Sequence, residues 1–326
     1  MFLVTGSSGR IGSSLVAALL ARGEAVRGFD ARPSGRTAPG YSEVVGQFSD
    51  AQAAARAMQG VSSVFHLGAF MSWLAADQAK LFDANVEGTR ALVAAANLEK
   101  VRRFIFASSG EVYPENLPEY LPVDEDHPLK PASAYGLTKL LGEEIVRWAG
   151  RSAGLAFTIL RFSHTQEATE LLDPDSFFSG PRFFLQPRIR QQEGFGNTAV
   201  VELLRRHDDG TPAMVLSRNQ NGRPFRMHIT DARDMVTGLL LALDTPATVG
   251  GTYNLGATDP VDFAGALPML AEITGYPIRT VDLPGVGVFY ETSNARFREV
   301  TGFQPAWPFA RMVEEAASAW RAKHRS

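Results

Sequence analysis

Two side chains near the middle of the chain, Tyr135 and Lys139, have types and a spacing suited to proton transfer. Residues four apart on a helix share one face, so the phenol and the ammonium group can interact. A free tyrosine has a pKa of about 10 and is a poor base at neutral pH, but a neighbouring cation favours the phenolate. Lowering that pKa by about three units corresponds to roughly 4 kcal/mol. We therefore predict an acid/base role for Tyr135; an ordinary pair on a helix surface is the alternative.

A second group of polar residues, Ser109 and Glu111, follows an apolar run at residues 103–107. If this run is a parallel strand, both side chains lie beyond its carboxyl end, where open α/β sheets bind their ligands. A hydroxyl at that place can hydrogen-bond a reacting oxygen, which makes Ser109 a candidate catalytic residue. Glu111 is either a further functional carboxyl or an exposed loop glutamate.

Three glycines in the segment 3–12, LVTGSSGRIG, form the strongest local signal in the sequence. Gly6 can make a tight turn, Gly9 lets the backbone approach a pyrophosphate, and Gly12 lets a helix pack closely on a strand. The start of the following helix offers free N–H groups and the positive end of its dipole to an anion. An apolar run precedes the glycines and a helical pattern follows them, so the segment predicts dinucleotide binding.

Asp30 lies at the end of the second predicted strand, eighteen residues after Gly12. A carboxylate there accepts hydrogen bonds from the adenosine ribose and repels a 2′-phosphate, which favours NAD over NADP. Arg32 and Arg36 follow closely and could instead bind a 2′-phosphate. A turn or helix-capping role for Asp30 is the structural alternative.

The elements that must position these residues alternate between short apolar runs and Ala- and Leu-rich helical stretches. Strands are expected at 2–5, 25–29, 43–46, 64–67, 103–107 and 157–160, and helices at 11–22, 51–58, 75–97 and 134–148. This alternation is typical of parallel strands joined by helical crossovers, with helices on both faces of a doubly wound sheet. The pattern weakens after Phe162, where residues 165–200 are rich in proline, glycine and phenylalanine and predict an irregular lobe.

The ordered motifs together resemble the extended short-chain dehydrogenase/reductases, specifically the NAD-dependent epimerase/dehydratase family. The matching segments are 5–12, 66–69, 85–89, 108–113 and 135–139. The resemblance implies an α/β fold with a doubly wound parallel (Rossmann) sheet and a smaller C-terminal substrate-binding lobe. We expect the NAD-binding domain to comprise residues 1–164 plus 226–255, and the lobe to comprise 165–225 plus 256–326.

The family resemblance also implies roles for individual residues. Tyr135 would be the catalytic acid/base, Lys139 would lower its pKa, Ser109 would bind the substrate oxygen, and Glu111 would be a second acid/base group. The predicted NAD-binding residues are Gly6, Ser8, Gly9, Arg10, Ile11, Gly12, Asp30, Gln47, Phe48, Leu67, Gly68, Ala69, Asn85, Ala107, Tyr135, Lys139 and Phe162.

The segments that would hold a nucleotide diphosphate depart from the family pattern. Near residue 226, the arginine of this chain does not stand at the position where the family usually has its diphosphate-binding arginine. Where the family later has Arg-x-Gly-Asp, this chain reads LPGV at 283–286. The lobe instead supplies arginines among aromatic residues, and guanidinium forks suit carboxylates or phosphates. The aromatic pairs at 177–178 and 183–184 are expected to form the core of the lobe. The predicted substrate-binding residues are Met71, Ser72, Ser109, Gly110, Glu111, His164, Arg182 and Arg188.

These features predict an enzyme that oxidises a sugar or sugar-derived alcohol, free or nucleotide-linked, by Tyr-assisted hydride transfer to NAD. In an epimerase or dehydratase the hydride returns to the sugar, and Glu111 could move a proton from the neighbouring carbon. A simple dehydrogenase of a sugar acid or polyol, which releases NADH, is one alternative. A non-catalytic NAD-binding sensor is another.

The composition of the chain excludes several other classes. Its 326 residues contain no cysteine, and 32 basic against 35 acidic residues leave a formal charge of −3. This balance gives no electrostatic footprint for nucleic acid, and the six scattered histidines show no metal-ligand spacing, so no metal is expected. No apolar run predicts a membrane span. We expect a cytoplasmic protein and, from the family resemblance, a homodimer paired through the helices at 75–97 and 134–148.

Overall fold

The computed structural model describes residues 1–324, which contain a seven-stranded parallel sheet in the order β11-β6-β5-β4-β1-β2-β3. The strands are β1 (Phe2–Thr5), β2 (Val26–Asp30), β3 (Tyr41–Val45), β4 (Ser63–His66), β5 (Arg103–Ser109), β6 (Phe157–Phe162) and β11 (Thr252–Leu255). The chain leaves β1 toward β2 and β3 and later returns to the other side of β1 with β4. The carboxyl ends of β1 and β4 therefore flank a topological switch point, where such sheets open a ligand-binding crevice.

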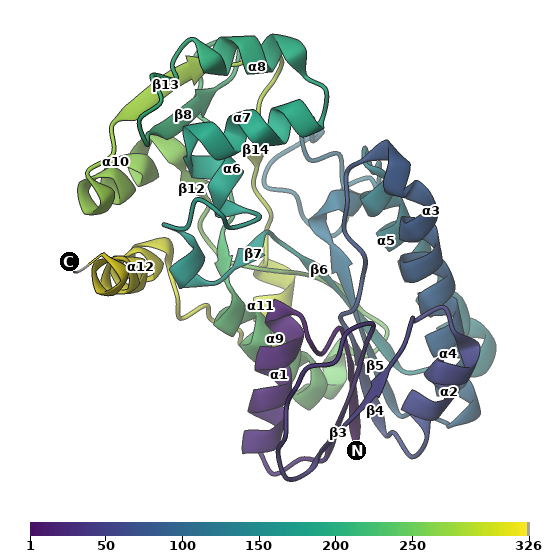
Figure 1. Ribbon diagram of the computed structural model, residues 1–326. Coiled ribbons are helices and arrows are strands. Elements are labelled where there is room, and N and C mark those ends of the chain that lie inside the picture. The colour runs from purple at the N-terminus through teal and green to yellow at the C-terminus, as the bar shows by residue number, and fades with distance from the viewer. Residues whose placement is uncertain (325–326) are drawn as a thin grey trace.

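Helices cover both faces of the sheet, as Figure 1 shows. One face carries α1 (Arg10–Ala21), α9 (Ala232–Asp244) and α11 (Ala295–Thr301); the other carries α2 (Ala51–Met58), α4 (Gly88–Leu98) and α5 (Ala134–Ala153). Each face has its own apolar core, and the central strands β4 and β5 are buried almost throughout. Strands buried on both sides explain the continuous apolar runs of the sequence. The predicted doubly wound fold is confirmed.

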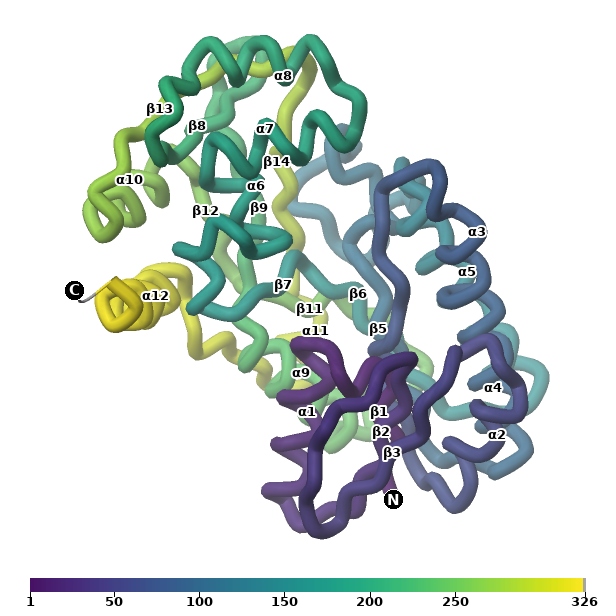
Figure 2. The backbone as a smooth tube through the Cα atoms, viewed as in Figure 1, coloured from purple at the N-terminus to yellow at the C-terminus, as the bar shows by residue number. Residues whose placement is uncertain are grey.

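A smaller lobe stands over the carboxyl edge of the sheet and has a separate apolar core, which includes Phe183, Met214 and Leu267. Figure 2 shows that two distant parts of the chain build it, one teal to green and the other light green to yellow. Its helices are α6 (Ser179–Phe183), α7 (Leu185–Gly194), α8 (Thr198–Arg205), α10 (Phe263–Thr274) and α12 (Phe309–Lys323). Its short strands are β7 (Thr165–Gln166), β8 (Met214–Arg218), β9 (Arg226–Met227), β10 (Thr230–Asp231), β12 (Val261–Asp262), β13 (Ile278–Asp282) and β14 (Phe289–Tyr290).

Two sequence-based expectations about local structure were wrong. The segment predicted as one helix at 75–97 is divided into a 3₁₀ turn, α3 (Gln78–Leu81), a π-helical turn (Phe82–Glu87) and α4. In the π-helical turn, Asn85 is buried and bonded to the backbone of Phe70 and to Thr138, contacts that outweigh ideal helix geometry. Residues 165–178 contain no α-helix, as expected of an irregular lobe, but residues 179–200 are mainly helical, in α6, α7 and the start of α8. Pro187 is compatible with α7 because it falls in the first turn, where its missing N–H leaves no hydrogen bond unmade.

Candidate active site

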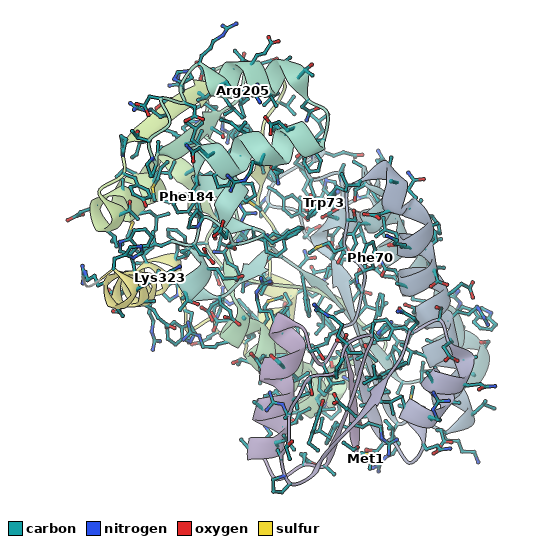
Figure 3. The ribbon with its side chains drawn as sticks, viewed as in Figure 1. Met1, Phe70, Trp73, Phe184, Arg205 and Lys323 are labelled. Atoms are coloured by element: carbon teal, nitrogen blue, oxygen red, sulfur yellow. The ribbon has the colours of Figure 1, made fainter. Side chains whose placement is uncertain are left out.

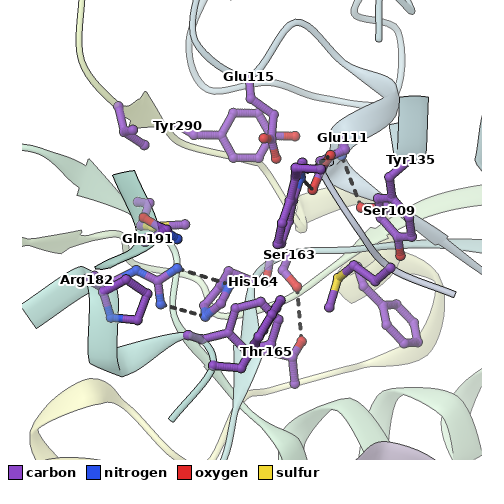
Figure 4. A pocket seen from close by; sticks show the side chains of 18 of the residues that line it. Ser109, Glu111, Glu115, Tyr135, Ser163, His164, Thr165, Arg182, Gln191 and Tyr290 are labelled. Atoms are coloured by element: carbon purple, nitrogen blue, oxygen red, sulfur yellow. Dashed lines mark hydrogen bonds between the residues drawn. The ribbon is translucent and has the colours of Figure 1, made fainter. Parts of the chain in front are cut away.

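A cavity of about 1090 Å³ lies between the carboxyl edge of the sheet and the lobe. Its walls include the glycine-rich turn, the ends of β5 and β6, the start of α5, and α6 and α7 of the lobe. Figure 4 shows Ser109, Glu111 and Tyr135 on one side of it, and Arg182 with Gln191 on the other. Residues from both halves of the sequence therefore meet around one cavity, whose volume is slightly above the range of about 300–1,000 Å³ typical of ligand pockets.

The glycine-rich turn forms one end of this cavity. A Cβ atom on Gly12 would lie 2.0 Å from the carbonyl oxygen of Gly6, so α1 can pack this closely on the turn only with glycine there. No side chain caps α1, and its first N–H groups thus keep their hydrogen-bonding capacity. Gly9, Arg10 and Ile11 line the cavity beside them. The turn therefore fits the pyrophosphate of a dinucleotide.

Asp30, at the carboxyl end of β2, is anchored beside this turn. One carboxylate oxygen accepts a hydrogen bond from the backbone N–H of Ser8 at 3.1 Å, and the other accepts one from the backbone N–H of Arg32, also at 3.1 Å. These bonds hold the carboxylate at the end of the strand adjacent to the glycine turn. Ser8 and Arg32 also border a second hollow, formed between the turn and residues 32–37.

Tyr135 and Lys139 project from the first two turns of α5, and both are buried. Gly136 lets this helix approach the turn after β5, since a Cβ there would lie 2.1 Å from the carbonyl oxygen of Glu111. The Lys139 Nζ lies 5.9 Å from the centroid of the Tyr135 ring and donates a 2.7 Å hydrogen bond to the carbonyl of Ala107. The helical pairing predicted from the sequence spacing therefore exists, in a buried setting.

Burial changes the proton affinities of this pair. Burial, and secondarily the charge of Glu111, raises the pKa of the Tyr135 phenol well above its usual value, while the Ser109 hydroxyl opposes that rise through a hydrogen bond. Burial lowers the pKa of Lys139 to about 8, and the nearby charge of Glu143 works against that decrease. Tyr135 is consequently protonated at neutral pH in the protein alone and requires further positive charge nearby to form a phenolate.

Glu111 lies next to Ser109 in the same wall of the cavity. Its carboxylate accepts hydrogen bonds from the indole N–H of Trp73, at 3.2 Å to each oxygen, and from the hydroxyl of Ser133, the residue that caps α5. The Ser109 Oγ in turn accepts the backbone N–H of Glu111 at 3.2 Å. Burial raises the pKa of Glu111, although both hydrogen bonds oppose the rise. A carboxyl of this kind can exchange protons closer to neutral pH than an exposed one.

The opposite wall of the cavity carries two arginines of the lobe. Arg182 donates a 2.7 Å hydrogen bond to the Nε2 of His164 and a 3.2 Å bond to the side-chain oxygen of Gln166. Arg188 donates to the side-chain oxygen of Gln191 at 2.8 Å. Because arginine only donates, the bonded nitrogen of His164 must be unprotonated. Burial and the charge of Arg182 accordingly keep the pKa of His164 well below its usual value.

Comparisons with known proteins agree with this geometry. The model of the NAD dependent epimerase/dehydratase family matches residues 2–169. A short-chain dehydrogenase/reductase superfamily protein from Agrobacterium tumefaciens, solved with bound NAD, is 63% identical, covers 99% of this chain and 98% of its own, and superposes with a TM-score of 0.96. The chain belongs to the NAD dependent epimerase/dehydratase family. The predictions of family, enzyme class and NAD cofactor are thereby confirmed.

Other proteins similar to this chain differ in how much of their own length the chain matches. A UDP-glucose 4-epimerase from Halalkalibacterium halodurans is 26% identical over 99% of this chain and 96% of its own. The uncharacterised protein y4nG of Sinorhizobium fredii is 35% identical over 79% of this chain, but that stretch is only 56% of y4nG. For a UDP-glucose 4-epimerase from Lactobacillus helveticus, the matched share of the relative is 52%. The chain thus spans about half the length of these last two relatives.

Most residues that the sequence singled out lie around this cavity between the sheet and the lobe. They are Gly6, Gly9, Arg10, Ile11, Gly12, Leu67, Ala69, Met71, Ala107, Ser109, Glu111, Tyr135, Lys139, Phe162, His164, Arg182 and Arg188. Ser8 borders the second hollow. The others, which do not line the cavity, are Asp30, Gln47, Phe48, Gly68, Ser72, Asn85 and Gly110.

Several residues outside the cavity support its walls. Phe48 packs edge-on against Phe29 in the core, with ring centroids 5.2 Å apart, and Gly68 leaves room for the Phe48 ring. Gly110 accepts a hydrogen bond from the Tyr290 hydroxyl at 2.9 Å. Ser72 donates to Asp77 at 2.7 Å in the loop that carries Trp73. These contacts fix the loops after β3, β4 and β5.

Sequence reasoning missed some residues of the cavity wall. Tyr290 comes from β14 and Glu115 from the loop after β5, and both line the cavity. The spacing of Glu115, four residues after Glu111, was the one local signal available.

Phe177 was expected in the lobe core, but it is 56% exposed and stacks on Trp73 with ring centroids 5.8 Å apart. Figure 3 shows Trp73 on the sheet-domain side, facing the lobe. Phe183 and Phe184 are buried in the lobe core, as predicted.

Replacing Asp30 with serine should weaken NAD binding about tenfold or more, because hydrogen bonds to a charged group contribute about 1.5–3 kcal/mol. NADP binding should improve in the same variant, because the carboxylate no longer repels a 2′-phosphate. Dissociation constants from fluorescence titration with each dinucleotide check both effects. An unchanged ratio of NAD to NADP affinity would contradict the assignment of Asp30 to the ribose.

Proposed function

We propose that this chain oxidises a hydroxyl-bearing carbon of a carbohydrate-like substrate through proton transfer to Tyr135. The observation that carries the proposal is the convergence of Ser109, Glu111 and Tyr135 on one wall of a cavity whose end is the glycine turn. A proton acceptor, a hydrogen-bond donor and a carboxyl therefore face a single space that also borders the predicted NAD site. This arrangement meets the geometric requirements for acid/base-assisted oxidation of an alcohol.

The cofactor would be held by the glycine turn and by Asp30, with Lys139 and Phe162 on the side of the reacting ring. When bound, NAD supplies a hydride acceptor and a positive charge. That charge matters for Tyr135, because burial and the charges of Glu111 and Glu115 raise the pKa of its phenol, whereas a nearby positive charge favours the phenolate. Tyr135 should therefore become an effective base mainly in the cofactor complex.

In the proposed reaction Tyr135 takes the hydroxyl proton of the substrate at its phenolate oxygen. The C–H bond of the same carbon breaks with transfer of a hydride, so the alcohol loses two electrons and two hydrogens and becomes a ketone. Ser109 hydrogen-bonds the substrate oxygen and keeps it near Tyr135. Lys139 holds the phenolate form by its charge, and its bond to Ala107 fixes the ammonium group in place.

Glu111 would extend this chemistry beyond simple oxidation. A ketone acidifies the neighbouring C–H, and a carboxylate at this place can remove that proton and return it. The raised pKa of Glu111 suits exchange in both directions near neutral pH. Epimerisation or elimination, with return of the hydride, is therefore the favoured outcome, and the relatives named as UDP-glucose 4-epimerases support this class.

The deciding experiment incubates the enzyme and NAD with candidate sugars, sugar acids and UDP-sugars. Product formation without net NADH absorbance supports internal return of the hydride, whereas one NADH per product would show a simple dehydrogenase. In D2O, the wild type should place deuterium on the carbon next to the oxidised one, and Glu111→Gln should abolish that label. Cofactor binding without turnover of any substrate would favour a non-catalytic NAD sensor.

A homodimer is part of the same proposal. Apolar side chains are exposed along α4 and α5: Leu98 is 83% exposed, Leu137 40% and Trp148 59%. Contact with a second copy would remove this surface from water. Light scattering at micromolar concentration should give twice the mass of the chain, and a monomer would refute this part.

Within residues 1–324, no helix has the length and apolar character needed to cross a bilayer.

A further inference from the structure

Arg182 and Arg188 on the lobe wall of the cavity bear charges that no acidic residue neutralises directly. Within residues 1–324, no carboxylate oxygen lies within 4.0 Å of either guanidinium group. The other cavity arginine, Arg10, pairs with Glu170, and the buried Arg161 pairs with Glu143 at 2.8 Å. Buried charges in proteins are normally paired in this way. Among the described residues, the two partly buried lobe arginines lack such a partner, as does the buried Arg103; unlike Arg103, they line the cavity.

The partners of Arg182 are neutral and hold the group without cancelling its charge. His164 accepts from it at 2.7 Å and Gln166 at 3.2 Å, while Gln166 is itself fixed by a 2.9 Å bond to Ser179. Burial, together with the charge of Arg188, lowers the pKa of Arg182 to about 9. The group thus remains a cation at neutral pH, although it is partly buried.

Arg188 is less completely satisfied. Its Nη1 donates to Gln191 at 2.8 Å, but its Nε is buried with no hydrogen-bond partner. Burial lowers the pKa of Arg188 to about 10, so this group too is charged at neutral pH. An unpaired buried donor on a cation is costly unless a ligand supplies the acceptor.

Two carboxyls, Glu111 and Glu115, line the cavity with Arg182, and the charge of Glu115 acts on Arg182. Glu115 is nevertheless a poor counter-ion at neutral pH. Burial, and after it the charge of Glu111, raises the pKa of Glu115 to about 8, against a smaller opposing effect of Arg182. Tyr135 and Tyr290 also lie close enough to respond to its charge. Below pH 8 Glu115 is therefore mainly protonated, and the lobe wall stays positive.

We propose that Arg182 and Arg188 bind an anionic group, a carboxylate or a phosphate, of the same substrate whose hydroxyl reacts at Tyr135. This inference rests on the proposed function, which it refines by naming the substrate class: small polyhydroxy compounds with one anionic end. Paired guanidinium groups suit both anions, since each can present two parallel N–H donors.

The arrangement in Figure 4 supports a substrate with two different ends. Ser109, Glu111 and Tyr135 occupy one side of the cavity, and Arg182 occupies the other. His164 lies beside Arg182, toward the middle of the cavity. A neutral sugar could satisfy the first side but would leave two partly buried cations without an anionic partner. An anionic sugar derivative satisfies both sides, and its charge would fix which hydroxyl meets Tyr135.

The test compares four probes: glucuronate, glucose 6-phosphate, UDP-glucose and neutral glucose. Binding is measured by calorimetry on the NAD-loaded protein, and kcat/KM is measured wherever turnover occurs. We expect at least one anionic probe to bind at least thirtyfold more tightly than glucose, and Arg188→Gln to remove most of that preference. Arg188→Lys should restore part of it, because a point charge remains. Arg190→Gln, an exposed arginine of the same helix, is the matched control and should behave as the wild type.

The pH dependence gives a second readout. As Glu115 ionises above pH 8, its negative charge competes for Arg182 and repels the ligand, so the dissociation constant of the anionic probe should increase between pH 7 and 9. Glu115→Gln should reduce this increase without removing it, because Arg182, with a pKa of about 9, also loses charge in this range. Preference for glucuronate identifies a carboxylate, and preference for either phosphorylated probe identifies a phosphate; both outcomes support the inference.

Equal binding of all four probes, or an anion preference that survives Arg188→Gln, would overturn the inference. Binding of none of the three anions would overturn it as well, because the site would then not be built for this charge. These results would not touch the proposed function, which fails separately if no alcohol is oxidised in a Tyr135-dependent manner. Calorimetry decides the anion question without any need for turnover.

Discussion

Replacement of Tyr135 with phenylalanine is expected to lower kcat about a thousandfold, with little effect on NAD affinity. The change removes only the phenolic oxygen and leaves a ring of the same shape in a buried site. Proton transfer by a positioned side chain contributes about 10²–10⁴ in rate. The oxygen is also the only part of this side chain that the proposed reaction uses. Single-turnover kinetics with the best substrate, together with titration of NAD, checks both halves of the expectation.

Tyr120→Phe is the matched control for this variant. Tyr120 is 42% exposed, donates to Asp124 at 2.7 Å, and does not line the cavity, so its activity should equal that of the wild type. A Tyr135→Phe protein that folds, binds NAD and retains more than about a tenth of the wild-type kcat would rule out Tyr135 as the base. Loss of NAD affinity in step with activity would instead indicate a positioning role.

Breaking the buried ion pair of Arg161 and Glu143 is expected to have the largest effect on stability. Two hydrogen bonds of 2.8 Å join the side chains, which are 3% and 0% exposed, and Glu143 also accepts from Ser108 at 2.6 Å. Removal of Arg161 leaves the buried Glu143 carboxylate with Arg147, 2.7 Å away and 21% exposed, as its remaining cationic partner. Loss of one member of a buried pair typically destabilises a protein by 3–5 kcal/mol, and the contact with Arg147 places this variant at the lower end, about 3 kcal/mol. Arg161→Leu should therefore lower the free energy of unfolding by about that amount in urea titrations.

The control and the pH dependence of this prediction follow from the same interactions. Arg90→Gln breaks an exposed pair with Glu87 and should change stability by less than about 1 kcal/mol. Burial alone would raise the pKa of Glu143, but the hydrogen bonds and charge of Arg161 outweigh it and hold the pKa below its usual 4.5. The ion pair thus contributes fully above pH 4.5, and its contribution is lost as the pH falls through the folded pKa. An Arg161→Leu protein as stable as the Arg90→Gln control would refute the assignment.

This ion pair also connects stability to the proposed site. Glu143 lies one turn after Lys139 on α5, and its charge supports the protonated form of that lysine. Ser108, which donates to Glu143, immediately precedes Ser109. Replacement of Arg161 should therefore also disturb the positions of Ser109 and Lys139 at the cavity. The activity of the Arg161 variant must be measured at temperatures where the protein remains folded.

The sequence alone determined the parts of this protein that depend on short-range geometry. The spacing of Gly6, Gly9 and Gly12 required a tight turn into a helix, because only glycine fits so close to the backbone of the turn. The four-residue spacing of Tyr135 and Lys139 placed both on one face of α5. Ser109 and Glu111 followed a strand directly, so their place at the sheet edge depended only on the strand being parallel.

The tertiary structure alone decided which distant segments share the cavity and how charged its far wall is. Arg182 was visible as a residue that suits anions, but its neutral partners depend on how the lobe folds over β6, as does the lack of a carboxylate within 4.0 Å among residues 1–324. Glu115 and Tyr290, 175 positions apart in the chain, meet there without any periodic signal. Desolvation and charge pairing arise from packing between such segments, and the spacing of residues along the chain does not encode either quantity.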